Sequence, residues 1–272
     1  MDDLAGLADW IATAGSVVAL TGAGISAPSG VPTFRGEDGV WDRFEEGQFT
    51  HGRFRRDPAG FWADRLELYE TMFDGEYEPN PAHEALAALG RAGHLGAIVT
   101  QNTDGLHGRA ARRVEEPDAD GTTPDTDGTV PDASAELVEL HGNAHSVRCV
   151  DCDRRRTIGP VLDRVRDGER PPTCPCGGVY KPDVVLFGER LPGDSLSRAR
   201  KLARGSDVFL AIGSSLVVEP AASLPRLAAR SGATLAVLNL ESTPCDGLAE
   251  FVSRTDVTRT LPAVETAVLE RS

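Results

Sequence analysis

Lysine is scarce in this chain of 272 residues. Only two of its 28 basic residues are lysines, Lys181 and Lys201, and the other 26 are arginines. Acidic residues number 42, so the formal net charge is −14. A strongly acidic surface repels nucleic-acid phosphates. The composition therefore predicts no direct nucleic-acid partner. It also resembles that of proteins from salt-loving microbes, in which high ionic strength screens the repulsion.

The sequence also lacks long apolar segments and a basic N-terminal region. No run of 18 or more apolar residues occurs, so no membrane-spanning helix is predicted. The first ten residues, MDDLAGLADW, carry acids where a secretory signal would carry bases. Hydrophobic residues still make up 40% of the chain, which is enough for a sizeable core. We expect a cytoplasmic protein that does not bind membranes and, because no oligomerisation motif is evident, a monomer.

Four short apolar runs predict buried strands. They read SVVALT (16–21), LGAIVTQN (95–102), DVFLAIGSS (207–215) and ATLAVLNLE (233–241). Helix-like segments lie next to them, such as PAHEALAALGRAG (81–93) and SLSRARKLARGS (195–206). Apolar strands that alternate with helices are typical of a doubly wound parallel sheet. The predicted fold is therefore α/β, with a Rossmann-type parallel sheet and helices on both of its faces.

Small or polar residues follow each of these strands. In parallel sheets of this kind a ligand binds outside the carboxyl ends of the strands. The candidate binding residues are therefore those at the strand ends: Gly22, Gly24, Gln101, Asn102, Asp104, Gly213, Ser214, Ser215 and Asn239.

The first of these turns, GAGISA, fits the dinucleotide-binding pattern G-x-G-x-x-G/A with Gly22, Gly24 and Ala27. Glycines there let backbone N–H groups approach a pyrophosphate. A single match is weak, and a tight turn without a ligand would look the same. A dehydrogenase would add a second strand ending in an acid about 20 residues later. DRFEEGQFT (42–50) has no such strand pattern, which favours a dinucleotide site without hydride transfer.

Four of the five cysteines form two close pairs, Cys149 with Cys152 and Cys174 with Cys176. Without an export signal, this spacing favours zinc over disulfides. Four thiolates complete a tetrahedral zinc site, which is then structural rather than catalytic. Free thiols or a redox pair are the alternative. The Cys174-x-Cys176 pair is one residue shorter than a usual zinc knuckle, which leaves the geometry open. Cys245 stands alone.

The segment 145–182 around these cysteines is too small to build much core, so it is predicted to be a small zinc-binding domain inserted in the larger one. The larger, Rossmann-like domain then comprises residues 1–144 and 183–272. Within it, EEPDADGTTPDTDGTVPDASA (115–135) is predicted to be an acidic, flexible loop. If four cysteines complete the metal site, neither His141 nor His145 is needed as a ligand. His141 is then available as a general base.

Seven blocks in order resemble the sirtuin family of NAD-dependent protein deacylases, of the bacterial and archaeal type. They are GAGISAPSGVPTFRG (22–36), TQNTDGLH (100–107), ELHGN (139–143), the paired cysteines, KPDVVLFGE (181–189), GSSLVVEPAA (213–222) and LNLESTP (238–244). The resemblance covers about residues 16–258. It implies that NAD, consumed as a co-substrate, and an acylated-lysine protein or peptide bind between the two domains. It also implies a helical cofactor-loop module over about 37–80.

The resemblance also implies roles for individual residues. Catalysis would involve His141, as the base that activates a ribose hydroxyl, and Asn102. The residues implied to bind NAD are Gly22, Ala23, Gly24, Phe34, Arg35, Gln101, Asp104, Gly213, Ser214, Ser215, Asn239 and Val257. Those implied to contact the substrate are Val185, Phe187, Gly188 and Glu189. One structural zinc per chain would be held by Cys149, Cys152, Cys174 and Cys176.

Departures from the family pattern bear on the acyl group. Thr103 stands where the nicotinamide pocket commonly has Ile or Val. The desuccinylating branch resembles Tyr-x-x-Arg with a small tunnel residue, whereas this chain has Trp62, Arg65 and, at the tunnel position, Phe49. Deacetylation, with release of nicotinamide and O-acetyl-ADP-ribose, is therefore expected. Removal of succinyl or other longer acyl groups and mono-ADP-ribosyl transfer are the alternatives on the same site. A zinc-ribbon nucleic-acid binder and an NAD-dependent dehydrogenase fit less well.

Overall fold

The computed structural model describes residues 4–33, 39–40, 43–73, 75, 77–115 and 134–271. Phe34 and Arg35 lie outside the described residues, as does most of the acidic segment 115–135. Among the helices that are described, none has the length and apolarity needed to cross a membrane.

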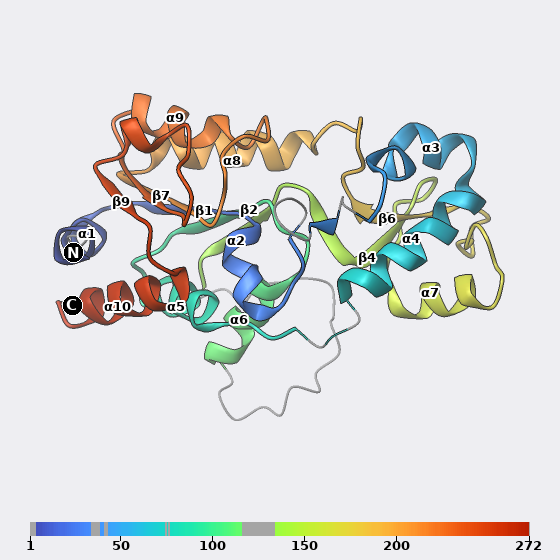
Figure 1. Ribbon diagram of the computed structural model, residues 1–272, viewed down its shortest axis with the longest axis horizontal. Coiled ribbons are helices and arrows are strands. Elements are labelled where there is room, and N and C mark those ends of the chain that lie inside the picture. Colours follow the sequence, from blue (N-terminus) through green and yellow to red (C-terminus); the bar gives the residue numbers. More distant parts are fainter. Residues whose placement is uncertain are drawn as a thin grey trace.

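The larger part of the molecule is built around a six-stranded parallel sheet (Figure 1). Its order is β3-β2-β1-β7-β8-β9, and each neighbouring pair runs parallel. The four apolar runs of the sequence form β1, β2, β7 and β8, so the predicted α/β fold class is confirmed. The strands are β1 (Val17–Thr21), β2 (Ala97–Thr100), β3 (Glu136–Glu139), β7 (Val208–Ile212), β8 (Thr234–Leu238) and β9 (Phe251–Ser253).

Helices cover both faces of this sheet. Successive residues of its central strands point to opposite faces and are apolar, so each face must be covered. Val17 and Ala19 of β1 pack in one core with α1 (Leu4–Thr13), α5 (Pro81–Arg91) and α10 (Val257–Leu269). Val18 and Leu20 pack in another with α8 (Gly193–Gly205) and α9 (Ser223–Arg230). Figure 1 shows α8 and α9 above the sheet and α5 and α10 below it. α6 (Leu106–Glu115) packs beside α5.

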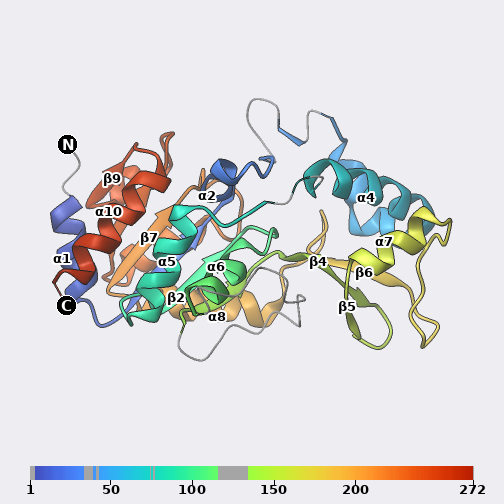
Figure 2. The same ribbon diagram turned by 90° about the horizontal axis from the view of Figure 1, so that it is seen from below.

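A second, antiparallel sheet of three strands lies at the end of the molecule opposite the termini (Figure 2). Its order is β5-β4-β6, with β4 (Gly142–Cys149), β5 (Arg155–Thr157) and β6 (Tyr180–Val184). The helices α3 (His51–Arg56), α4 (Pro58–Phe73) and α7 (Gly159–Arg166) lie beside it. Short helices elsewhere are α2 (Ala23–Ser26), η1 (Ala27–Ser29), η3 (Glu46–Phe49) and η4 (Asp246–Leu248).

A third core cluster joins this small sheet to α4. Phe61 and Trp62 of α4 are fully buried and pack in the same cluster as Val147 of β4 and Tyr180 of β6. The indole Nε1–H of Trp62 also donates a hydrogen bond of 2.9 Å to the Tyr180 carbonyl oxygen. Residues 39–40 and 43–73 therefore share their core with the cysteine-containing segment and not with the large sheet.

Candidate active site

The two sheets enclose a cavity of about 1010 Å³. One wall comes from the carboxyl ends of β1, β2, β7 and β8, and the other from residues 184–191 with η3 and α4. The candidate site residues that line it are Gly22, Ala23, Gly24, Gln101, Asn102, His141, Val185, Phe187, Gly188, Glu189, Gly213, Ser214, Ser215, Asn239 and Val257. Asp104 lines a small adjoining cavity, which it shares with Ala23 and Asn102. The structure thus brings together every candidate ligand-binding residue of the described chain.

Glycines allow the turn after β1 to lie against the turn after β7. A Cβ atom on Gly24 would come 2.8 Å from the Gly213 Cα, and one on Gly22 would come 2.8 Å from the Gly213 carbonyl oxygen. Gly213 itself has φ +58°, a backbone conformation that residues with a side chain rarely adopt. The N–H groups of Gly22 and Gly24 donate hydrogen bonds of 3.0 and 2.8 Å to the carbonyl oxygens of Ile212 and Gly213, so the two turns are also joined through their backbones.

His141 lines the cavity and has a defined tautomer. Its Nδ1 lies 2.9 Å from the carbonyl oxygen of Gln101, which can only accept a hydrogen bond. Nδ1 therefore carries the proton, and Nε2 has a free lone pair. Burial lowers the pKa of His141 below its ordinary value, and the hydrogen bond to Gln101 partly offsets that shift. The imidazole is neutral at pH 7 and can take a proton through Nε2.

Asn102 and Asp104 are held by the glycine-rich segment. The Asn102 Nδ2 donates hydrogen bonds of 3.0 Å to the Gly22 carbonyl oxygen and to the Ser26 hydroxyl. Burial raises the pKa of Asp104, although hydrogen bonds from Leu106 N–H and from Ser26 oppose the shift. Both side chains are more than nine-tenths buried, so their orientation is set by these partners and not by water.

Two buried histidines beneath the site, His83 and His107, escaped sequence analysis. Their rings lie 4.9 Å apart, and the pKa of each is lowered by burial. His83 Nδ1 accepts from the Asn80 backbone N–H at 3.4 Å, so its Nε2–H donates to the Ser26 hydroxyl at 3.3 Å. The amino-acid sequence contains no local pattern that predicts this arrangement, because the partners come from segments distant along the chain.

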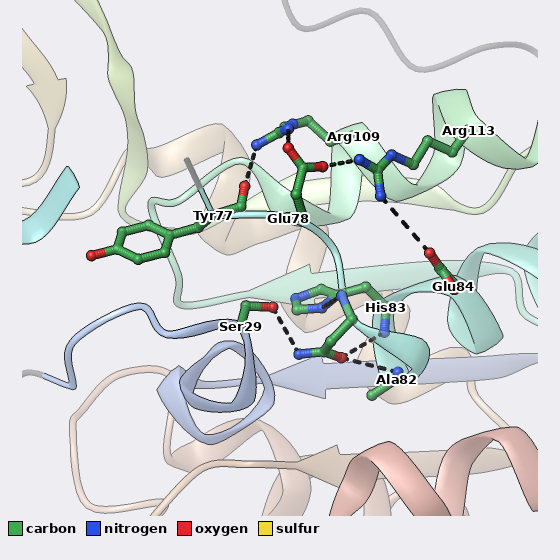
Figure 3. A network of polar contacts seen from close by, with 9 residues as sticks. Ser29, Tyr77, Glu78, Ala82, His83, Glu84, Arg109 and Arg113 are labelled. Atoms are coloured by element: carbon green, nitrogen blue, oxygen red, sulfur yellow. Dashed lines mark hydrogen bonds and ion pairs between the residues drawn. The ribbon is translucent and has the colours of Figure 1, made fainter. Parts of the chain in front are cut away.

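The N-terminal end of α5 is tied to its surroundings by further polar contacts. Figure 3 shows Glu78, just before α5, between Arg109 and Arg113 of α6. The Arg109 guanidinium also donates to the Tyr77 carbonyl oxygen. Asn80 caps α5 and donates to the Ser29 hydroxyl at 3.0 Å. These contacts fix the position of His83 next to α2.

The opposite wall is pinned at both ends. Val185 N–H donates to the His141 carbonyl oxygen at 2.9 Å, and Phe187 pairs with the segment that leads into α3. The Glu189 carboxylate accepts from the Lys181 ammonium and from the Leu186 N–H, each at 3.0 Å. The Lys181 ammonium also donates to the Val184 carbonyl oxygen at 2.7 Å. Glu189 therefore holds this wall in shape as well as lining the cavity.

Arg65 is a buried cation on the same cavity. Its side chain is 7% exposed, and its Nε has no hydrogen-bond partner among the described residues. Burial lowers the pKa of Arg65 to about 10, so the guanidinium stays charged at pH 7. Phe49 and Thr103 also line the cavity, whereas Trp62 does not. The aromatic residue at the first position of the W-x-x-R pattern therefore points into the core of the small sheet.

The four paired cysteines form a candidate metal centre away from this cavity. All four Sγ atoms lie within 4.8 Å of one another, with 3.5 Å between Cys149 and Cys176 and 3.7 Å between Cys152 and Cys174. Tetrahedral zinc with Zn–S bonds of about 2.3 Å requires S···S distances of about 3.8 Å, close to these two distances. The shortened Cys174-x-Cys176 pair brings both of its Sγ atoms into the cluster. Cys245 is buried in the core between the large sheet and helices α8 and α9 and takes no part.

Comparisons with known proteins agree with one another. The model of the Sir2 family matches residues 22–119 and 126–220. An NAD-dependent protein deacetylase from Haloarcula marismortui is 49% identical over 271 residues, which cover 97% of this chain and 96% of that protein. An NAD-dependent protein deacylase 2 from Archaeoglobus fulgidus is 39% identical, covering 90% and 88%. The solved structure of Sir2Tm bound to a propionylated peptide gives a TM-score of 0.78 at 32% identity, covering 98% and 99%.

Proposed function

This chain belongs to the Sir2 family, and we propose that it is an NAD-dependent protein lysine deacetylase. The resemblance seen in the seven sequence blocks is thereby confirmed. The proposed reaction transfers the acetyl group of an acetyl-lysine protein or peptide to ADP-ribose, releasing nicotinamide and O-acetyl-ADP-ribose. The observation that carries the proposal is His141, a neutral imidazole whose Nδ1 is bonded to Gln101 and whose ring lines the cavity.

Residues of the large-sheet rim are proposed to bind NAD. The glycine-rich turn 22–24, which lines the cavity, is proposed to lie against the pyrophosphate. Ser214, Ser215, Asn239 and Val257 are proposed to hold the adenosine half. Gln101, Asn102 and Asp104 are proposed to hold nicotinamide and its ribose. Phe34 and Arg35, assigned to the same cofactor on the resemblance alone, remain part of this proposal.

NAD supplies an electrophilic ribose carbon when nicotinamide leaves. His141 is proposed to take a proton from a ribose hydroxyl through its Nε2, so that this hydroxyl becomes a better nucleophile. Val185, Phe187 and Gly188 are proposed to pair with the backbone of the substrate and to enclose its acyl-lysine. No metal is proposed at the reacting carbon.

One zinc ion per chain is proposed to bind the four cysteine thiolates. Four protein ligands leave no position for water, so the metal would contribute folding free energy and not Lewis acidity. Cys149 and Cys174 of this cluster lie in the third core together with α4, so we propose a smaller unit that includes residues 39–40 and 43–73 besides 145–182. A monomeric state, a cytoplasmic location and the lack of nucleic-acid binding stay predictions from the sequence.

The test follows nicotinamide release and peptide mass together, in molar salt, with an acetyl-lysine peptide and with or without NAD. Equal amounts of free nicotinamide and deacetylated peptide, formed only with NAD, are expected. Nicotinamide release from NAD while the peptide keeps its acetyl group would instead indicate mono-ADP-ribosyl transfer or NAD hydrolysis. A change of nicotinamide absorbance with a reducible substrate would indicate a dehydrogenase.

The buried Arg65 favours a second candidate, the removal of an acidic acyl group such as succinyl. A buried cation is costly, and the described residues give the Nε of Arg65 no hydrogen-bond partner, so a carboxylate on the acyl chain would stabilise it. The Phe49 ring lines the same cavity, and its bulk takes up space there and favours acetyl. Acetyl and succinyl peptides of one sequence decide between the two. If succinyl is the substrate, Arg65→Met removes succinyl turnover far more strongly than acetyl turnover.

A further inference from the structure

A buried set of hydroxyls connects β1 and β2 beneath the candidate active site. Thr21 and Thr100 are the last residues of the two strands and are register partners. The Thr21 hydroxyl donates to the Thr100 hydroxyl at 2.8 Å. His107, in the first turn of α6, places its Nε2 2.9 Å from the Thr21 oxygen. All three residues are at most 5% exposed, so water does not replace these contacts.

Counting protons assigns the tautomer of His107. The single O–H of Thr21 is given to Thr100, so the contact with His107 requires an N–H on Nε2. His107 Nδ1 is then a bare acceptor, and it has no partner in the described part of the chain. The reverse assignment would place the proton on Nδ1, which has no acceptor in the described part of the chain. Burial, with His83 beside it, keeps the imidazole neutral.

The Thr100 hydroxyl then meets the backbone that carries the active site. It accepts a hydrogen bond of 3.1 Å from the Asn102 N–H. That N–H belongs to the same peptide group as the Gln101 carbonyl, which accepts from His141 Nδ1 at 2.9 Å. Because a peptide group is planar, holding its N–H also sets the direction of its C=O. Thr100 and His141 therefore form hydrogen bonds with opposite ends of one planar peptide group.

We propose that His107 is a positioning residue for His141 and Asn102, acting through Thr21, Thr100 and the 101–102 peptide group. This inference rests on the proposed deacetylase function. His107 does not contact the cavity, so it is not a catalytic residue. Its Nε2–H fixes the Thr21 hydroxyl, which then donates to Thr100 and leaves the Thr100 oxygen placed to receive the Asn102 N–H. Without that donor the Thr21 hydroxyl can turn away, and the peptide group can rotate.

Thr21→Val and Thr21→Ser form the matched pair of variants. Valine keeps the shape of threonine but removes the hydroxyl, and serine keeps the hydroxyl. Thr21→Val is expected to lower kcat about tenfold, the scale of one lost hydrogen bond, with KM for the acetyl peptide nearly unchanged. Thr21→Ser is expected to retain most of the activity. Val264→Ala, in the core around α10, is the control for a general loss of stability, and it should leave kcat unchanged.

Variants of His107 give the second comparison. Glutamine can place an amide N–H near the position of Nε2, so His107→Gln should retain more kcat than His107→Leu. If the chain acts as a unit, His107→Leu should cost little further activity in the Thr21→Val background. Fully additive losses, or a Thr21→Val enzyme with wild-type kcat, would overturn the proposal.

A spectroscopic readout separates this proposal from the proposed function. Nitrogen-15 spectra of the wild-type imidazoles at pH 7 should show His107 as the neutral Nε2–H tautomer and His141 as the neutral Nδ1–H tautomer. In Thr21→Val the His141 pKa or tautomer ratio should change, whereas in Val264→Ala it should not. A protonated or Nδ1–H His107 would refute the assignment. If the wild type lacks deacetylase activity but shows these spectra, the proposed function fails and the positioning chain stands.

Discussion

The Nδ1 of His141 lies 2.9 Å from the carbonyl oxygen of Gln101, the residue that follows β2. This contact joins the connection between the two sheets to the rim of the large sheet. It fixes the proton on Nδ1 and thereby assigns the Nε2 lone pair to the proton transfer.

His141→Ala is expected to abolish deacetylation, because no other described imidazole lines the cavity. The fold and the zinc content should be retained, since His141 is not a metal ligand. His94→Ala, just after α5, is the matched control and should keep full activity. Deacetylation by His141→Ala at a near wild-type rate would exclude it as the base.

The pH dependence of the wild-type reaction follows from the same histidine. The base must be neutral, so kcat/KM should fall as the pH drops through the pKa of His141. Burial lowers that pKa, which places the acidic limb below the ordinary histidine value of about 6.5. The pH dependence of kcat/KM for the acetyl peptide, measured with saturating NAD, locates this acidic limb. A limb above that value would mean that another group governs the rate.

Cys174→Ser is expected to release the metal and to unfold the small sheet. Three remaining thiolates bind zinc weakly, and a domain with little core depends on its metal. Metal analysis should show less than one zinc per chain, with a loss of thermal stability. Cys245→Ser, a buried cysteine outside the cluster, should keep its zinc. A stoichiometric zinc content in Cys174→Ser would contradict the four-cysteine site.

Gly24→Ala tests the close approach of the two strand-end turns. Its new methyl group would lie 2.8 Å from the Gly213 Cα, so one turn must shift. We expect a loss of roughly 1–3 kcal/mol in the free energy of unfolding and weaker NAD binding. Gly47→Ala is the control, because its methyl group meets nothing within 4 Å. Calorimetry of both variants, with and without NAD, measures the two effects.

Buried His83 predicts a pH dependence of stability. Burial lowers its pKa to about 4, whereas the unfolded state has a pKa of about 6.5. Between these values the unfolded state binds more protons, so His83 destabilises the fold as the pH falls. The loss between pH 7 and pH 5 is about 2 kcal/mol.

Glu139 acts in the opposite direction. Burial raises its pKa to about 7, so the folded state takes up a proton as the pH falls and gains stability. The two effects oppose each other in the wild type. Urea unfolding of wild type and of His83→Gln at each pH isolates the histidine. Identical slopes of unfolding free energy against pH in the two proteins would refute the assignment.

The large sheet and its rim were predictable from the sequence because both are local patterns. The run SVVALT gives a buried strand, and the turn after it must be glycine-rich to approach another backbone. The strand-end residues Asn102, Ser214 and Asn239 were found from the rule that ligands bind at the carboxyl ends of parallel strands. The cysteine spacing indicated a metal site in the same way.

Contacts between distant segments were not predictable. The burial of Trp62 against Tyr180 joins α4 to the small sheet, yet the two residues lie 118 positions apart. The short strand β9 and the helix α7 have no periodicity strong enough to stand out in one sequence. The partners of His83 and His107 likewise depend on how α5 and α6 pack, so their tautomers follow only from the structure.

The anchoring of Lys181 has a practical consequence for an enzyme of acylated amines. Its ammonium is held by Glu189 and by the Val184 carbonyl oxygen, so the exposed Lys201 on α8 is the single lysine side chain open to solvent reagents. The chain therefore has scarcely any lysine amine that an acyl donor could acylate. A mass-spectrometric assay should see almost no self-modification, and an amine-reactive dye should label one side chain.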